Sequence, residues 1–112
     1  MIVCGSRGWE DRERVELRLS QLPPSPTTTI VHGDAPGPDR IAGSFGSLLG
    51  MTVESHPAEW ERLGKSAGRV RNEKMALLGA DLCIAFWDGV SKGTKDMIDR
   101  CHLHGIEVEI IR

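Results

Sequence analysis

The sequence predicts an α/β domain in which helices cover both faces of a five-stranded parallel sheet. Short apolar runs alternate along the chain with segments whose apolar residues recur at helical spacing. Strands that alternate with helices in this way pair in parallel through right-handed crossovers. Two of the runs, Leu82–Phe86 and Ile106–Ile111, are apolar enough to predict strands that are covered on both faces.

The first strand and the first helix come before a proline cluster. Ile2–Cys4 is a short apolar run and predicts the strand. Asp11–Leu22 predicts the helix, because it places on one helical face the apolar residues Val15, Leu19 and Leu22. Residues 23–26 include three prolines, which cannot continue a helix and therefore predict a stiff loop.

Two further strands flank a second helix. Thr28–His32 is rich in β-branched residues and predicts the second strand. The helix that follows residue 39 is expected to end at Gly50, because glycine favours the position after a helix. Its expected apolar face consists of Ile41, Phe45, Leu48 and Leu49. Met51–His56 predicts the third strand.

The second half of the chain is expected to supply two strands and two helices. Glu59–Leu78 is less regular than the other segments and predicts a helix over its second half only. Asp81–Trp87 is a nearly continuous apolar run and predicts the fourth strand. After it we expect a loop at Asp88–Gly93, a helix at Thr94–Leu103 and the last strand at Ile106–Ile111.

The composition excludes several classes of protein. The chain has 112 residues, 39% of them hydrophobic and 27% charged, which fits one compact domain over residues 1–112 without a membrane span. A net charge of −2 argues against binding nucleic acid through bulk charge. Three cysteines at scattered positions imply no disulfide framework, so we expect a reduced, cytoplasmic protein. No cofactor and no metal are expected.

Glycines follow three of the predicted strands. They form the pairs Gly5 and Gly8, Gly33 and Gly37, and Gly89 and Gly93. The carboxyl ends of parallel strands meet at one edge, where α/β proteins bind ligands. Glycine lets the backbone approach a ligand, and the free amides at helix starts attract phosphate. We therefore expect a phosphate-bearing ligand at this edge, although any one of these turns can need glycine for its geometry alone.

A series of motifs keeps a fixed order along nearly the whole chain. The series consists of Gly5-Ser6-Arg7, His32-Gly33-x-Ala35-x-Gly37-x-Asp39, Trp60, Gly64-Lys65-x-Ala67-Gly68-x-x-Arg71-Asn72-x-x-Met75, and Ala80-Asp81 through Gly93-Thr94-Lys95-Asp96-Met97. Taken together, these motifs resemble the cpYpsA-related (YspA-like) family of the SLOG superfamily, which also includes the Lonely-Guy phosphoribohydrolases and the DNA-processing SMF proteins.

The resemblance implies a Rossmann-like three-layer sandwich, a single SLOG domain with strand order 3-2-1-4-5. It also implies a site for a nucleotide or a nucleotide-derived small molecule at the C-terminal edge of the sheet. Members of the superfamily include sensors as well as enzymes. We expect binding as a sensor or sequestering module, in a homodimer or a higher homo-oligomer.

The resemblance also assigns roles to individual residues. Gly5, Ser6 and Arg7 would meet phosphate, with a surface ion pair to Glu10 or Asp11 as the alternative for Arg7. Asp39 would accept hydrogen bonds from ribose hydroxyls, or else cap the second helix. The remaining matches are Gly33 and Gly37 in the second loop, the pair Arg71 and Asn72, and the phosphate cradle Gly93 and Thr94, of which Thr94 is equally a candidate N-cap.

Aromatic and basic residues add further candidates. Trp9 and Trp87 fall in loops at the expected ligand edge, where either can stack on a base, or else plug the core or a dimer interface. A basic stretch lies between the third and fourth strands and consists of Arg62, Lys65, Arg69, Arg71 and Lys74. Of these, Arg62, Lys65 and Arg69 are expected on one helical face. The stretch suits the phosphates of a small ligand, a solvated surface or, least well, nucleic acid.

One departure from the hydrolase branch concerns catalysis. That branch ends its last glycine motif with a glutamate that acts in glycosidic cleavage, and Met97 occupies this position here. A methionine can neither donate a proton nor stabilise an oxocarbenium ion by charge. The sequence therefore favours binding over catalysis. A Lonely-Guy-like hydrolase that cleaves an N-glycosidic or phosphate bond with Asp39, Glu73 or Asp88 is the second hypothesis, and a DNA-binding module is the third.

Overall fold

The sheet has the predicted topology. The computed structural model describes residues 1–23 and 28–112. Five parallel strands lie in the order β3-β2-β1-β4-β5, which confirms the predicted α/β class and strand order. The strands are β1 (Ile2–Gly5), β2 (Thr29–His32), β3 (Thr52–Ser55), β4 (Cys83–Phe86) and β5 (Val108–Ile111). Of the predicted stiff loop at 23–26, all but Pro23 lies outside the described residues.

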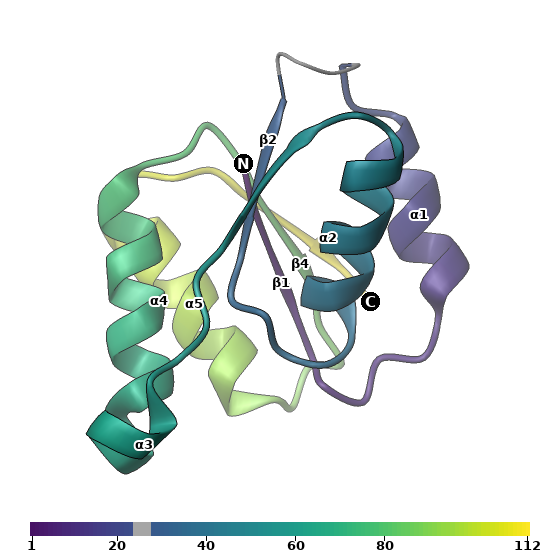
Figure 1. Cartoon of the computed structure of the whole chain (residues 1–112). Helices are drawn as coiled ribbons and strands as arrows, with labels where there is room; N and C mark the ends of the chain where they lie inside the picture. The colour runs from purple at the N-terminus through teal and green to yellow at the C-terminus, as the bar shows by residue number, and fades with distance from the viewer. Residues whose placement is uncertain (24–27) are drawn as a thin grey trace.

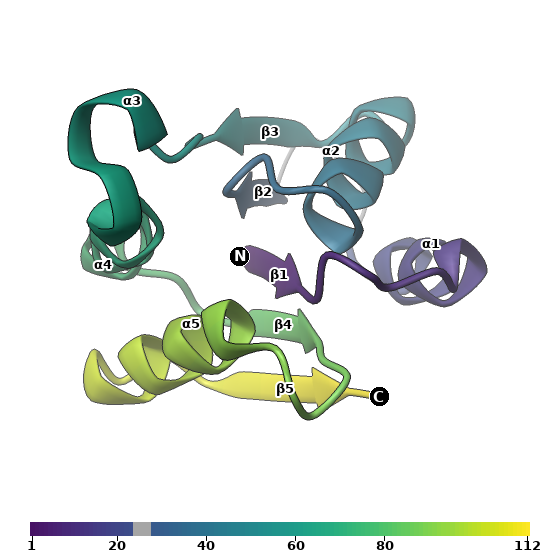
Figure 2. The same ribbon diagram turned by 90° about the horizontal axis from the view of Figure 1, so that it is seen from below.

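Helices cover both faces of this sheet (Figures 1 and 2). On one face lie α1 (Arg12–Ser20) and α2 (Pro38–Leu48). On the other face lie α4 (Ala67–Leu78) and α5 (Lys92–Leu103), which pack against each other. Between β3 and α4 the chain forms the one-turn helix α3 (Trp60–Leu63) and a 3₁₀ turn (Gly64–Ser66) at the outer end of α4. The arrangement is a Rossmann-like three-layer sandwich.

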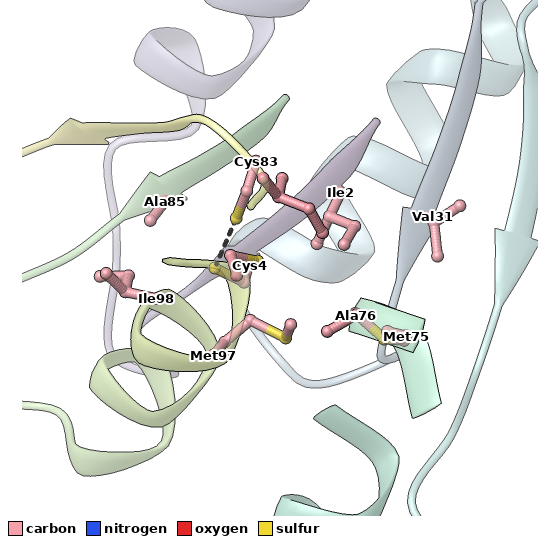
Figure 3. Close-up of a cluster of buried hydrophobic side chains, with 11 residues drawn as sticks. Ile2, Cys4, Val31, Met75, Ala76, Cys83, Ala85, Met97 and Ile98 are labelled. Atoms are coloured by element: carbon pink, nitrogen blue, oxygen red, sulfur yellow. Dashed lines mark hydrogen bonds between the residues drawn. The ribbon is translucent and has the colours of Figure 1, made fainter. Parts of the chain in front are cut away.

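Alternate strand residues divide the core between the two faces, as the pleat of a strand requires. Ile2 and Cys4 point to the α4–α5 face, where they join Met75 and Met97. Figure 3 shows this cluster, with the sulfur atoms of Cys4 and Cys83 3.9 Å apart. Val3, between them in the sequence, points to the α1–α2 face and joins a second cluster with the predicted helix residues Val15 and Leu19. All three cysteines are buried and free.

The buried face of α2 differs from the prediction. Leu48 is 80% exposed and Leu49 is 37% exposed, so the predicted apolar face was wrong in this half. The helix instead lays small residues against the sheet, chiefly Ala42 and Gly46. A Cβ atom on Gly46 would lie 3.2 Å from the side chain of Ile30. The lack of a side chain therefore lets this helix approach β2 closely, and Leu48 and Leu49 turn outward, whereas Ile41 and Phe45 pack against the core as predicted.

The helix ends follow the sequence signals with two differences. Gly50 adopts a φ of 81° directly after α2, and the amide of Met51 donates to the carbonyl of Gly46 at 2.9 Å, which confirms the predicted glycine cap. The helix α4 confirms the prediction for the second half of 59–78, but the short helix α3 before it was not predicted. The helix α5 begins at Lys92 after the N-cap Ser91, two residues earlier than predicted, so Thr94 lies inside the helix and is not its N-cap.

The last strand lies at the edge of the sheet, which explains its partial exposure. Ile110 is 44% exposed, and Glu109 is half-buried in a salt bridge with Arg18 at 2.7 Å. The prediction that both faces of this strand are covered was therefore wrong, whereas the fourth strand, β4, is buried throughout. Across residues 1–23 and 28–112, no helix combines the length and the apolar composition needed to cross a membrane.

Candidate functional site

A cleft of about 630 Å³ opens at the C-terminal edge of the sheet. Its walls come from the loops after β1, β2 and β4, from α3 and α4, and from the start of α5. This volume lies in the range of small-molecule sites. The cleft brings together eight of the predicted site residues, which are Gly5, Ser6, Arg7, Asp39, Arg71, Asn72, Gly93 and Thr94. The other four predicted residues, Trp9, Gly33, Gly37 and Trp87, do not line it.

The first turn of α5 supplies amides to this cleft. Lys92, Gly93 and Thr94 line it, and their backbone N–H groups have no acceptor within the described part of the chain. The loop before them is fixed by Asp88, whose Oδ1 accepts from the amides of Val90 and Ser91, each at 2.8 Å. These amide hydrogen bonds hold the pKa of Asp88 below its ordinary value. The helix thus presents free donors at the position where anions bind.

Ser6 links the loop after β1 to the loop after β4. Its Oγ accepts a hydrogen bond of 3.1 Å from the amide of Asp88, and the side chain is buried. The glycines on either side of it, Gly5 and Gly8, differ in the space available for a side chain. A Cβ atom on Gly5 would meet the ring of Pro38 and lie 2.7 Å from the carbonyl oxygen of Phe86, whereas one on Gly8 would have no neighbour within 4 Å. Gly5 is therefore required by packing, and Gly8 leaves open space beside the cleft.

Arg7 faces an aromatic ring instead of a carboxylate. Its guanidinium lies 5.8 Å from the ring centroid of Trp60, in cation–π geometry. No carboxylate among the described residues lies within salt-bridge distance of Arg7, so the alternative of an ion pair with Glu10 or Asp11 is not realised. Trp60 is 50% exposed on the cleft wall, and its ring lies beside Gly68, where a Cβ atom would be 3.4 Å from it, in ordinary van der Waals contact.

Trp60 is the cleft residue that sequence reasoning missed. It belongs to the motif series, but the sequence favours Trp9 and Trp87 as candidates because they fall in loops at the expected ligand edge. In the structure Trp9 packs edge-to-face on Phe86 at 5.6 Å, and Trp87 donates its indole N–H to the carbonyl of Ser91 at 3.0 Å. No local pattern places Trp60 at this edge; its membership of the motif series is the signal that could have identified it.

Asp39 and Arg71 brace the second loop. Asp39 is the second residue of α2, behind the N-cap Gly37, so it does not cap the helix. Its Oδ2 accepts hydrogen bonds from the amides of Gly33 at 3.0 Å and Ala35 at 3.2 Å. Burial raises the pKa of Asp39 to about 6, against the opposing effects of these amides and of the Arg71 charge. The carboxyl therefore holds the loop shape as well as lining the cleft.

Arg71 explains why residue 33 is glycine. The guanidinium donates to the carbonyl of Gly33 and, through Nε, to Oδ1 of Asn72 at 2.8 Å. A Cβ atom on Gly33 would overlap the guanidinium. Gly37 has a different cause, because its φ is 89° and a Cβ there would lie 2.8 Å from the carbonyl oxygen of Ser6. Packing, not access for a ligand, therefore accounts for both glycines.

Asn72 fixes α4 to the start of α5. Its Nδ2 donates to Oδ2 of Asp96 at 3.0 Å, and the same Asp96 oxygen accepts from Nε of Arg100 at 2.9 Å. Met97, the next residue, is 1% exposed and forms part of the cleft wall. Of the carboxylates weighed as catalytic groups, Asp39 and Asp88 line the cleft, whereas Glu73 lies outside it and pairs with Arg100 and His104.

Basic side chains outnumber acidic ones around the cleft. The basic residues are Arg7, Lys65, Arg69, Arg71 and Lys92, and the acidic residues are Asp39, Asp88 and Asp96. The basic stretch is divided, because Gly64 with a φ of 58° interrupts the helical run. The prediction that Arg62, Lys65 and Arg69 share one helical face was therefore wrong, since Arg62 lies in α3 and Arg69 in α4. Arg62 and Lys74 line a different hollow. The residues of the stretch that line the cleft, Lys65, Arg69 and Arg71, suit an anionic ligand.

Comparison with known proteins agrees with the architecture. The family model of the YspA, cpYpsA-related SLOG family matches residues 1–63. The chain is also similar to the "Gene 61 protein" of Mycobacterium phage D29, with 39% identity over 115 residues, 96% of this chain and 92% of that protein. No solved structure matches. Since the family match spans more than half of the chain, from β1 to α3, the chain belongs to the YspA, cpYpsA-related SLOG family.

Proposed function

We propose that the cleft binds a nucleotide or a nucleotide-derived small molecule and that the protein acts as a sensor or sequestering module. Membership of the SLOG family supports a nucleotide-related role. The observation that carries the proposal is the meeting of free α5 amides and an aromatic ring in one cleft, at Gly93 and Trp60. A phosphate group fits the amides and the basic side chains, and a base fits the ring.

The α5 amides and Arg7 are the proposed phosphate donors. Arg7 has no carboxylate partner in the described residues, so its charge is available to a ligand. Thr94 adds a buried hydroxyl, which lies 3.2 Å from Oγ of Ser91. Asp39 stands at the second loop, where an oxygen acceptor suits ribose hydroxyls. These assignments follow the family's motif positions.

Calorimetry with a panel of nucleoside monophosphates tests the proposal. We expect one of them to bind. Gly93→Ala is expected to weaken the binding of that nucleotide at least about tenfold, because the new methyl group enters open space beside the amides. The same change is expected to leave the free energy of unfolding equal or up to about 1 kcal/mol higher, since alanine favours a helix. Arg7→Ala is expected to weaken binding by a similar factor. Absence of binding across the panel, or full affinity in both variants, would contradict the proposal.

Trp60 is the proposed base platform. Trp60→Leu is expected to weaken the binding of a nucleoside monophosphate by about tenfold, in line with base–aromatic stacking of ~1–3 kcal/mol. Ribose 5-phosphate, which lacks the base, serves as the control ligand and is expected to bind the variant and the parent equally. An equal loss for both ligands would mean that Trp60 shapes the cleft without stacking on a base. Isothermal titration of the two ligands provides the measurement.

Binding without turnover is favoured over hydrolysis by one observation. Met97, at the position of the hydrolase-branch glutamate, is buried in the cleft wall and carries no ionisable group. The carboxylates that do line the cleft are engaged: Asp88 with loop amides, Asp96 with Asn72 and Arg100, and Asp39 with the second loop. Incubation with nucleoside monophosphates is accordingly expected to release no free base.

A further inference from the structure

A second hollow, of about 350 Å³, lies beside α3 and α4 and shares Arg71 with the cleft. It is lined by the connection from β3 to α3 and by one face of α4. Its apolar part is formed by Pro57, Ala58, Leu63, Ala67 and Val70. Its basic part is formed by His56, Arg62, Arg71 and Lys74. A hollow that combines an apolar wall with converging cations suits a small organic anion.

His56 contributes a buried nitrogen without a hydrogen-bond partner. Its Nε2 is shielded from solvent, and no group in residues 1–23 and 28–112 bonds to it. The nearest carboxylate oxygen, Oε1 of Glu54, is 3.6 Å away, which is beyond hydrogen-bond distance. Buried polar atoms in native structures are normally satisfied, by protein groups or by a bound molecule. A turn of the imidazole ring would bring this nitrogen to the surface of the hollow, where an oxygen atom of a ligand would supply the missing partner.

Two cations of the hollow retain free donors. Lys74 has no salt bridge or hydrogen bond with any described residue. Arg71 uses Nε and Nη1 on Asn72 and Gly33, while its Nη2 group has no acceptor among the described residues. Arg62 differs, because it is paired with Glu59. The free donors are therefore those of Lys74 and Arg71, next to the unpartnered nitrogen of His56.

We propose that this hollow is a second binding site, for a small organic phosphate or carboxylate, with His56, Lys74 and Arg71 as its donors and the apolar residues against the organic part. Arg71 lines both this hollow and the cleft, so it touches two ligand sites at once. Apart from Arg71, the residues that form the second site do not line the cleft. Its existence does not depend on nucleotide binding in the cleft.

Nuclear magnetic resonance of the full chain with phenyl phosphate and benzoate as probes tests this site. We expect saturable shifts of the His56 ring and of the Lys74 and Val70 amides. Lys74→Ala and His56→Gln are each expected to weaken binding by about tenfold or more, as measured by titration of the Val70 amide shift. Lys95→Ala, which removes an exposed lysine of α5, and Gly93→Ala in the cleft are the matched controls and are expected to leave them unchanged. Phenyl phosphate binding without benzoate would identify phosphate as the group, and the reverse would identify carboxylate.

Several outcomes would overturn the proposal. Shifts confined to Gly8, Gly93 and Thr94 with either probe would show that small anions use the cleft alone, which leaves the proposed function standing. Val70 amide shifts that persist in Lys74→Ala and His56→Gln, or that sodium chloride reproduces, would reduce the effect to general ionic strength. Conversely, a cleft that binds no nucleotide would leave the second site intact if the His56 and Lys74 shifts are present and depend on those side chains.

Discussion

Gly5→Ala is expected to lower the free energy of unfolding by about 2–3 kcal/mol, the magnitude of overpacking in a well-packed core. The new methyl group would overlap the ring of Pro38 at the start of α2 and come within 2.7 Å of the carbonyl oxygen of Phe86 in β4. Both obstacles are rigid, one a proline ring and the other backbone of a paired strand. Relief therefore requires α2 or β4 to move, and urea denaturation measures the cost.

The matched control is Gly8→Ala, three residues along the same loop. A Cβ atom on Gly8 meets nothing within 4 Å, and its φ is not in the left-handed region. We expect its free energy of unfolding to stay within about 0.5 kcal/mol of the parent, as for other surface changes. Equal denaturation midpoints for Gly5→Ala and the parent would show that α2 is not seated on β1 as closely as the structure places it.

Asp39→Asn is expected to raise the free energy of unfolding above pH 6 and to leave it nearly unchanged below pH 4. Burial raises the pKa of Asp39 from 3.8 to about 6. Between these values the native state holds the proton that the unfolded state has released, so the free energy of unfolding of the parent falls as pH rises. The shift corresponds to about 3 kcal/mol at full ionisation. Asparagine carries no charge to desolvate and still offers an oxygen to the amides of Gly33 and Ala35.

Chemical denaturation of both proteins between pH 4 and pH 8 measures this difference. The stability of Asp39→Asn relative to the parent should rise through the window between pH 4 and 6 and then level off. Asp81→Asn is the control, because that side chain is 90% exposed and its removal should leave the pH profile unchanged. Parallel profiles for Asp39→Asn and the parent would mean that Asp39 ionises in the native state as easily as in water.

The fold was predictable because its signals are local. The alternation of apolar runs and helical spacing predicts five strands, and Gly50 follows α2 with the positive φ that the sequence implies. The face of α2 was not predictable in this way. The side chains that the helix buries are small, and hydrophobic spacing gives weight to large residues such as Leu48, which lies on the outside.

The lining of the cleft was predictable where it follows strands directly, and less so where it comes from α3. The loops of Gly5 and Gly93 follow strands, and parallel topology brings their ends together. Trp60 reaches the same cleft from a short helix after β3, which no local pattern places at that edge. The same holds for the contact between Arg71 and Gly33, 38 residues apart in the chain.

That contact has a consequence for how this family can change over evolution. The space that a side chain at position 33 would need is filled by the guanidinium of Arg71, and the carbonyl of Gly33 is one of its two acceptors. A relative that replaces the arginine with a shorter residue frees that space, and only then can position 33 accept alanine or serine. A side chain at position 33 is therefore expected only in relatives that lack the arginine at position 71, whereas glycine at position 33 is compatible with either residue there.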